Sequence, residues 1–116
     1  MTKEQIIEGR NYIAELGGYK KITNFIPDVW DNGKRKITSL SFDKPAMFGE
    51  LMHIVADVEQ SKDLIIEVKR CQCSISKMHL TRNQKFINID GGASKQMAIF
   101  KALSELYNTT LVFDNL

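Results

Sequence analysis

Apolar side chains recur with a helical period between Phe42 and Val58, and this is the clearest pattern in the chain. Asp43 and Pro45 lie at its start, and a side-chain acceptor followed by a proline is typical of the beginning of a helix. The apolar residues then follow at i, i+3, i+4, i+7 and i+10 on one helical face: Phe48, Leu51, Met52, Val55 and Val58. The pattern predicts a helix that covers a hydrophobic core, and no catalytic constellation accompanies it.

Two more helices are predicted near the ends of the chain. Thr2 and Gln5 have the spacing of a capping box, and a glycine pair ends the first helix. Ser94 is placed to cap the last helix, over Lys95–Tyr107, and the polar residues that follow are expected to end it. Residues 109–116 then remain as an extension or tail, which is apolar for a chain end.

Three segments between the second and third helices are read as strands, with residues 60–63 as a polar connection before them. The first is Leu64–Lys69; the second places Cys71, Cys73 and Ile75 on one face, and the third contains Phe86, Ile87 and Ile89. Short turns join the three segments. Because parallel neighbours need long crossovers, we expect an antiparallel meander.

Residues 19–40 have the least regular pattern. Asp31-Asn32-Gly33 is a strong turn signal, so Val29-Trp30 and Arg35–Leu40 are predicted to form a small hairpin. The arms are unequal and rich in lysine, and a long ordered loop is the alternative.

The predicted order of elements is therefore helix, irregular hairpin, helix, three strands and helix. This order predicts a single α+β domain over residues 1–116, in which three helices cover a three-stranded antiparallel meander. The arrangement is expected to be either two-layered or an α/β/α sandwich.

The composition agrees with one globular domain, since 116 residues are too few for two cores. No apolar run is long enough for a transmembrane span, and the charged start does not resemble a signal peptide. We therefore expect a cytoplasmic protein without membrane contact. The net charge of +2 is too small to imply a nucleic-acid partner, although basic residues gather between Lys62 and Lys85.

Few residues are suited to catalysis or to metal binding. Cys71 and Cys73 would share one strand face, but Zn²⁺ needs two further ligands, and the two histidines, His53 and His79, are on different elements. A nucleophilic pair of Cys73 with His79 lacks an acid to orient the imidazole. The sequence therefore predicts no catalytic residue, no metal and no cofactor, and a protein that is not an enzyme.

Two segments are candidates for anion binding. One is the basic triplet Lys34, Arg35 and Lys36, for which a solvated surface is the alternative. The other is a glycine-rich turn at a helix start, where free N–H groups favour anions: Gly91, Gly92, Ser94 and Lys95. A capped strand-to-helix turn explains the same residues without a ligand.

Two other segments are candidates for partner binding. Trp30 lies in the irregular region and is either an anchor onto the core of the domain or a hot spot for a partner. The apolar residues Leu111, Val112 and Phe113 near the end of the chain could add a strand to the domain's own sheet, or to the sheet edge of a second copy and so form a homo-oligomer.

Several segments carry a resemblance to a known group of proteins: Ile13–Gly17, Leu40–Lys44, Leu51-Met52 with Val55, Cys73–Ile75 and Lys95–Asn108. Through them the chain resembles small uncharacterised proteins of bacteriophages and prophages, related to the phage ABA sandwich domain. Residues 45–47 depart from this resemblance, because a serine–tryptophan pair is expected there. The group has no agreed activity, so the resemblance implies a bacterial host cytoplasm as the setting and no particular mechanism.

These observations lead to three hypotheses about function. The preferred one is a phage- or prophage-encoded accessory protein that binds a host or phage protein and inhibits a host defence component by protein–protein contact. The first alternative is a sponge that sequesters a nucleotide signal at the two anion-binding segments. The second is a nucleic-acid-binding protein that uses the basic central strands, for which binding should depend steeply on salt.

Overall fold

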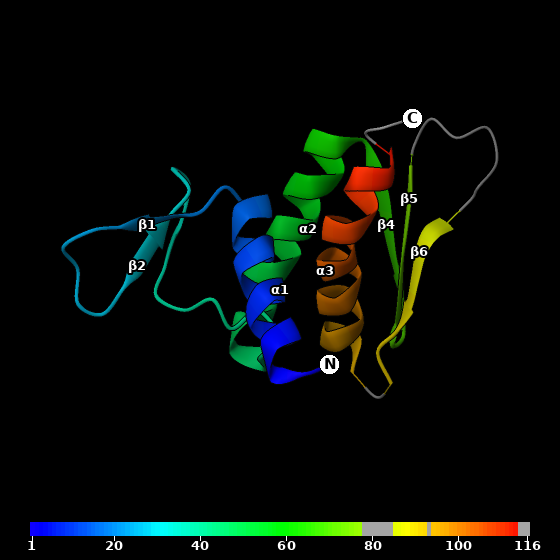
Figure 1. Ribbon diagram of the computed structural model, residues 1–116, viewed down its shortest axis with the longest axis horizontal. Helices are drawn as coiled ribbons and strands as arrows, with labels where there is room; N and C mark the ends of the chain where they lie inside the picture. Colours follow the sequence, from blue (N-terminus) through cyan, green and yellow to red (C-terminus); the bar gives the residue numbers. More distant parts are fainter. Residues whose placement is uncertain (78–84, 93, 114–116) are drawn as a thin grey trace.

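The computed structural model describes the backbone of residues 1–77, 85–92 and 94–113, and the side chains of residues 1–76, 87–92 and 94–106. Its helical segments are α1 (Lys3–Leu16), the 3-10 turn η1 (Pro45–Met47), α2 (Phe48–Lys62) and α3 (Lys95–Phe113). Its strands are β1 (Lys20–Ile22), β2 (Val29–Asp31), β3 (Lys36–Ile37), β4 (Leu64–Lys69), β5 (Gln72–Lys77) and β6 (Lys85–Asp90). Figure 1 shows their arrangement.

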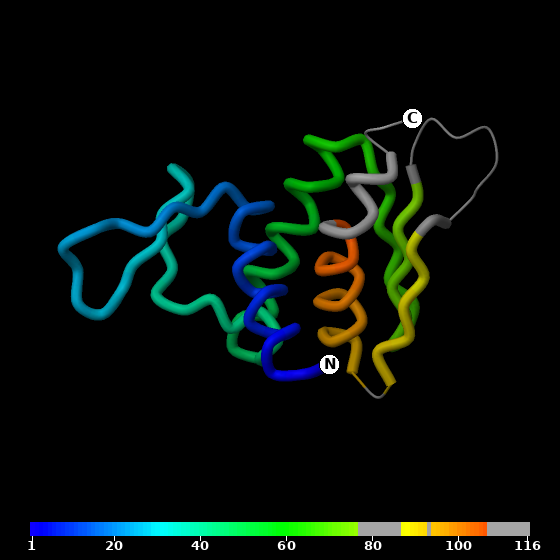
Figure 2. Tube along the Cα trace, in the orientation of Figure 1, coloured from blue at the N-terminus to red at the C-terminus, as the bar shows by residue number. Residues whose placement is uncertain are grey.

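The strands form two separate antiparallel sheets, each with its strands in sequence order. The larger sheet, β4–β5–β6, is the predicted meander, and β4 has the predicted bounds. All three helices lie on one side of this sheet (Figures 1 and 2). Helix α3 packs against β5 and β6, α2 packs against β4, and α1 packs against α3. The α+β prediction is confirmed, and the helices cover one face of the sheet rather than sandwiching it.

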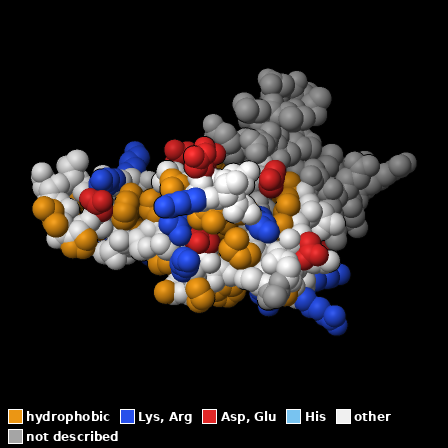
Figure 3. Space-filling model, turned by 60° about the horizontal axis from the view of Figure 1, so that its bottom comes forward, with side chains coloured by type: hydrophobic (Ala, Val, Ile, Leu, Met, Phe, Trp, Pro, Cys, Tyr) orange, Lys and Arg blue, Asp and Glu red, His pale blue; other side chains and the backbone are white. Residues whose placement is uncertain are grey.

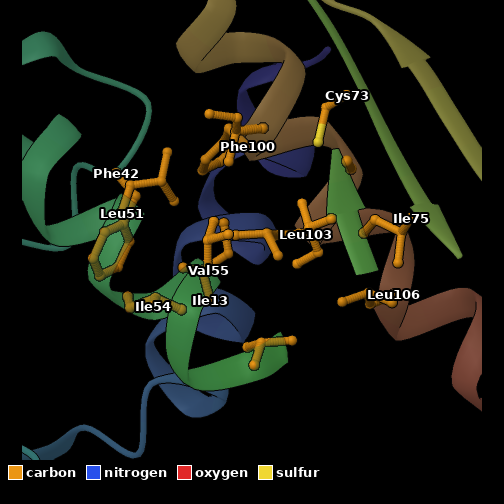
Figure 4. Packing of buried hydrophobic residues seen from close by; sticks show 14 of the residues in the cluster. Ile13, Phe42, Leu51, Ile54, Val55, Cys73, Ile75, Phe100, Leu103 and Leu106 are labelled. Carbon is orange, nitrogen blue, oxygen red and sulfur yellow. The ribbon is translucent and has the colours of Figure 1, made fainter. Parts of the chain in front are cut away.

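The hydrophobic core lies between this sheet and the helices (Figure 4). The helices and the loop before α2 supply its largest buried side chains, among them Ile13, Phe42, Leu51, Ile54, Phe100 and Leu103. The sheet supplies alternate residues, because every second side chain of a strand faces the same side: Leu64, Ile66, Cys73, Ile75 and Ile87. Each such side chain contributes about 1.5–3 kcal/mol of burial free energy.

The buried stripe of α2 differs from the predicted one at three positions: Phe48 is only half-buried, Met52 is exposed, and Ile54 is buried. Its buried residues are Leu51, Ile54, Val55 and Val58, which follow the spacing i, i+3, i+4 and i+7. Met52, which was predicted to belong to the stripe, is 37% exposed. Residue 52 lies about 100° around the helix from residue 51, on the side away from Ile54. The face that meets the core is therefore rotated toward Ile54.

Both ends of α2 differ from the sequence prediction. Asp43 does not cap the helix, since the 3-10 turn separates the two and no side chain caps α2. Its carboxylate instead accepts from Arg10 of α1, with Nε–Oδ1 at 2.7 Å and Nη2–Oδ2 at 3.1 Å. A bidentate pair with a guanidinium is stronger than a single cap, and it lowers the pKa of Asp43. At the other end, the predicted polar connection is helical as far as Lys62, where Asp63 takes a left-handed conformation.

The last helix is longer than predicted. Ser94 caps α3 as expected, since its Oγ accepts from the Met97 N–H at 3.1 Å. However, α3 continues to Phe113, so the prediction of a helix end at Tyr107 and of a separate tail from residue 109 is wrong. Asn and Thr are only about 0.5 kcal/mol per residue poorer helix formers than Ala, which is too little to stop a helix that is already formed.

Candidate functional site

The smaller sheet belongs to residues 19–40, which we call the lobe and which project from the helices at one end of the molecule (Figure 1). Strands β2 and β3 pair as the predicted hairpin requires. Strand β1 pairs with β2 along its three residues and was not predicted from the sequence. The lobe is therefore a three-stranded sheet, which decides the question left open between a hairpin and an ordered loop.

The two faces of the lobe have different surroundings. Trp30 and Ile37 are partners in one cross-strand row, and both pack against the main core, Ile37 buried and Trp30 half-buried. Because alternate residues of a strand face opposite sides, the next row faces away from the core. It holds Lys20 and Lys36, both exposed, on either side of Asp31. Trp30 thus acts in part as an anchor of the lobe.

The loop between β1 and β2 carries two large apolar side chains into solvent. Ile26 is 100% exposed and Phe25 is 55% exposed, and we call this pair the tip. Figure 3 shows hydrophobic side chains gathered at the end of the lobe. Beside the tip, Lys21 and Asp28 form an exposed ion pair, with Nζ–Oδ1 at 3.4 Å. The tip is the most exposed apolar feature among the described side chains.

A polar cluster attaches the lobe to α2, and we call it the latch: Tyr19, Arg35, Glu50 and Asp57. The Arg35 guanidinium donates to Glu50 Oε1 through Nε at 2.9 Å and to Asp57 Oδ2 through Nη2 at 3.3 Å. Tyr19 Oη donates to the same Glu50 oxygen and accepts from Arg35 Nε at 3.3 Å. Burial, together with the hydrogen bond to Glu50, raises the pKa of Tyr19 to about 12, and the bond to Glu50 raises the pKa of Arg35.

The turn between β2 and β3 brings Arg35 into this position. Asn32 Oδ1 accepts from the backbone N–H groups of Lys34 at 2.9 Å and of Arg35 at 2.7 Å. Asn32 Nδ2 donates to the Gly17 carbonyl at 3.1 Å and so ties the turn to the end of α1. Gly33 adopts a φ of +85°, which side chains with a Cβ avoid. The Asn-Gly turn signal of the sequence is therefore also what directs the guanidinium to α2.

The three residues of the predicted basic triplet have different surroundings. Arg35 is engaged by two carboxylates of α2, so its charge is compensated within the fold. Lys34 and Lys36 are exposed, and Lys36 faces the same side as Lys20. The lobe thus presents lysines to solvent while its arginine serves to attach it.

The glycine-rich turn, Gly91–Lys95, joins β6 to α3. Three of its N–H groups have partners within the protein. The Gly91 N–H donates to the Cys71 carbonyl at 2.8 Å, the Gly92 N–H donates to the Asp90 carboxylate at 2.9 Å, and the Ser94 N–H donates to the Gly91 carbonyl at 3.3 Å. Ser94 accepts from the first turn of the helix. The turn and the lobe lie in different parts of the molecule (Figure 1), so the two predicted anion-binding segments do not converge.

Only one of the two cysteines is a core residue, since Cys71 lies in the turn before β5. Cys73 is fully buried, and burial raises the pKa of its thiol to about 11, so the thiol stays protonated at neutral pH. Cys71 is half-buried. Among the residues whose side chains are described, no three metal-ligating groups lie together. His79, considered above as a partner of Cys73, lies outside the described residues.

The apolar residues at the end of the chain were predicted to be partner contacts. The backbone of Leu111, Val112 and Phe113 belongs to α3, and their side chains lie outside the described part of the chain. Within the described ranges, no helix has the length and hydropathy that a membrane crossing requires.

A second surface feature lies along α1, where this helix meets α3 and β6. It is a groove of about 570 Å³, which we call the α1–α3 groove. Tyr12 and Ile89, both half-buried, supply apolar lining, and α1 adds the exposed carboxylates of Glu8 and Glu15. From α3 come Lys101 and the exposed Glu105, among other residues.

Sequence reasoning did not single out the tip or the groove. An exposed Phe25-Ile26 pair looks like any short apolar run in a sequence, and only its position between two turns hints at exposure. The groove joins residues of α1 with residues of β6 and α3 more than 70 positions later, which no local pattern reveals. Comparisons of the chain with family models, with curated proteins and with solved structures gave no match.

Proposed function

We propose that this protein acts by binding another protein through the lobe, with the tip at the centre of the contact. The observation that carries the proposal is the exposure of Phe25 and Ile26 at the end of a projecting, attached sheet. Leaving two such side chains in water forgoes about 1.5–3 kcal/mol each, which a partner can recover by covering them. Large apolar side chains that enter a pocket of the partner are typical centres of protein interfaces.

The surroundings of the tip support a contact with a specific protein. The latch and the Trp30–Ile37 row hold the lobe against the body, so little ordering entropy is lost on binding. Lys20, Lys34 and Lys36 add exposed charges that can select a partner of opposite sign. The resemblance to phage-encoded proteins favours a bacterial host protein as a partner, and inhibition of a host defence component is the proposed consequence.

Photo-cross-linking in cells tests this proposal. Ile26 is replaced by benzoylphenylalanine, and the matched control carries the same group at Met52, an exposed apolar position on α2. We expect a discrete covalent adduct from position 26 and none of the same mass from position 52. The absence of any discrete adduct at position 26, or identical adducts from both positions, would reject the lobe as a binding surface.

A further inference from the structure

The positive charge of the protein is concentrated in the lobe. Residues 19–40 contain five basic and two acidic side chains, a formal charge of +3, whereas the whole chain has +2. Lys21 is paired with Asp28, and Arg35 is paired within the latch. The exposed lysines that remain for a partner are Lys20, Lys34 and Lys36, with the acidic Asp31 between Lys20 and Lys36 in the sheet. The lobe thus combines an apolar tip with a positively charged base.

The α1–α3 groove has the opposite combination. Glu8 and Glu15 are seven residues apart on α1, so they lie on one face of the helix, and Glu105 adds a carboxylate from α3. Lys101 and the α-amino group of Met1 are the positive groups of the lining, so its three carboxylates exceed them by one. Between these charges lie the half-buried side chains of Tyr12 and Ile89. The groove therefore offers an apolar lining with a negative rim.

We infer that, when no other partner is bound, the tip of one copy docks in the α1–α3 groove of a second copy. This inference rests on the proposed function, because it assigns an occupant to the same lobe. A groove of about 570 Å³ lies in the range of about 300–1,000 Å³ typical of ligand pockets, enough for the side chains of a phenylalanine and an isoleucine. The lysines of the lobe then face the carboxylates of the rim.

The lobe and the groove of one molecule do not meet. The latch fixes the lobe to α2, and the lobe projects away from the helices (Figure 1), so the tip reaches only another molecule. The contact joins two different surfaces and is heterologous, which gives closed rings or growing chains according to the angle between copies. Every copy retains one tip and one groove.

The distribution of charge around the tip favours this occupant over an anionic membrane. The lysine beside the tip, Lys21, is already neutralised by Asp28. The exposed lysines are five or more residues from Phe25 along the chain, toward the base of the lobe. Binding to lipid headgroups would require unpaired lysines next to the inserted apolar side chains. A groove lined by carboxylates can instead meet lysines that lie nearer the base of the lobe than the tip does.

Light scattering and sedimentation velocity over a concentration series test the inference. We expect the wild type to exceed the monomer mass of 13.2 kDa as its concentration rises, and added salt to weaken the association. Phe25→Ser with Ile26→Ser should remove the tip, and Glu8→Lys with Glu15→Lys should reverse the rim; both variants should stay monomeric. All four positions are exposed, and circular dichroism melts verify that the variants fold.

Matched controls carry the same kinds of change elsewhere. Met52→Gln with Ile65→Thr removes exposed apolar side chains outside the lobe, and Glu4→Lys with Glu59→Lys changes the net charge outside the groove. Both controls should associate as the wild type does. If either control were monomeric, a general change in surface apolarity or net charge would be enough to abolish association, without loss of this contact. That result would count against the inference.

Mixing the two monomeric variants is the decisive measurement. The tip variant keeps an intact groove, and the groove variant keeps an intact tip, so the mixture should form a one-to-one dimer that grows no further. A monomeric wild type at every concentration, or a mixture without the dimer, overturns the inference. The inference is also overturned if the tip variant loses binding to phosphatidylserine vesicles while its mass in solution stays equal to that of the wild type. A wild type that stays monomeric when purified, together with a cross-linked adduct at position 26 to a different protein, would reject the second copy and leave the proposed function standing.

Discussion

At the scale of single residues, Arg35 connects the candidate binding surface to the rest of the protein. Its guanidinium is the only group of the lobe that bonds to two carboxylates of α2 among the described side chains. The geometry uses the planar fork of arginine, which lysine cannot reproduce. Its neighbours Lys34 and Lys36 have the same formal charge, but they face solvent.

Arg35→Ala should lower the free energy of unfolding by about 1–3 kcal/mol, because Glu50 and Tyr19 would lose a partner while remaining largely buried. Urea denaturation measures the change. Lys34→Ala is the matched control, since this exposed lysine is adjacent in sequence and its removal should cost less than about 0.5 kcal/mol. Equal effects of the two substitutions would show that the latch contributes no net stability.

Tyr19 gives the protein a predictable response to alkaline pH. Its pKa is about 12 in the folded protein and about 10 in an unfolded chain, so the folded state holds the phenol proton more tightly. The resulting stabilisation is complete below about pH 10 and is lost as the pH rises toward 12. Tyr19→Phe lacks this contribution. The free energy of unfolding of the wild type should therefore exceed that of Tyr19→Phe by less at pH 11.5 than at pH 9. Urea midpoints at the two pH values measure it, and a constant difference would contradict the raised pKa.

At the scale of the elements, the close approach of α1 to α3 depends on Gly9. A Cβ at this position would lie 2.6 Å from Ser104 Oγ and 3.0 Å from the ring of Phe100. The short distance explains why a glycine stands in the middle of a helix, where its backbone freedom is a cost. The same packing forms one wall of the α1–α3 groove, because both Gly9 and Ser104 line it.

Two glycine-to-alanine substitutions should therefore have opposite effects. Gly9→Ala should destabilise the protein by about 1–3 kcal/mol through overpacking. Gly49→Ala, on α2, meets nothing within 4 Å and should stabilise it by about 0.5–1 kcal/mol through helix propensity. Thermal melts compare the two variants. A stabilising Gly9→Ala would mean that α1 and α3 separate without cost.

The regular elements were predictable because each rests on a local signal. The capping box at Thr2, the period of two in β5 and the Ser94 cap all depend on residues within a few positions of one another. The errors arose where distant residues compete with local ones. Asp43 has the sequence of a cap, but Arg10, 33 positions away, takes its carboxylate. The latch and the groove are likewise formed by residues brought together only by folding.

At the scale of the whole molecule, the protein consists of a well-packed body and the lobe. The body is formed by the helices and the sheet β4–β5–β6, and few contacts attach the lobe to it. The strands of the body have six residues each, whereas those of the lobe have two or three. The lobe shares only a few side chains with the core, chiefly Tyr19, Trp30 and Ile37. Regions with few buried contacts open at lower free energy than the core of a protein does.

Trp30 allows this difference to be measured, because it is the only tryptophan of the chain and lies in the lobe. In urea, its fluorescence should change at a lower concentration than the far-ultraviolet circular dichroism, which reports mainly on the three helices. In Arg35→Ala the two transitions should separate further. Coincident transitions in both proteins would show that the lobe and the body unfold as one cooperative unit.

The full exposure of Ile26 also bears on how such a protein can evolve. A side chain that touches nothing in its own fold is under no constraint from folding, so mutations at this position alter recognition without altering stability. The body keeps its sequence requirements, while the end of the lobe is free to change whenever the surface that it meets changes. Diversity among relatives should therefore be concentrated at residues 23–28, and the latch residues should vary least within the lobe.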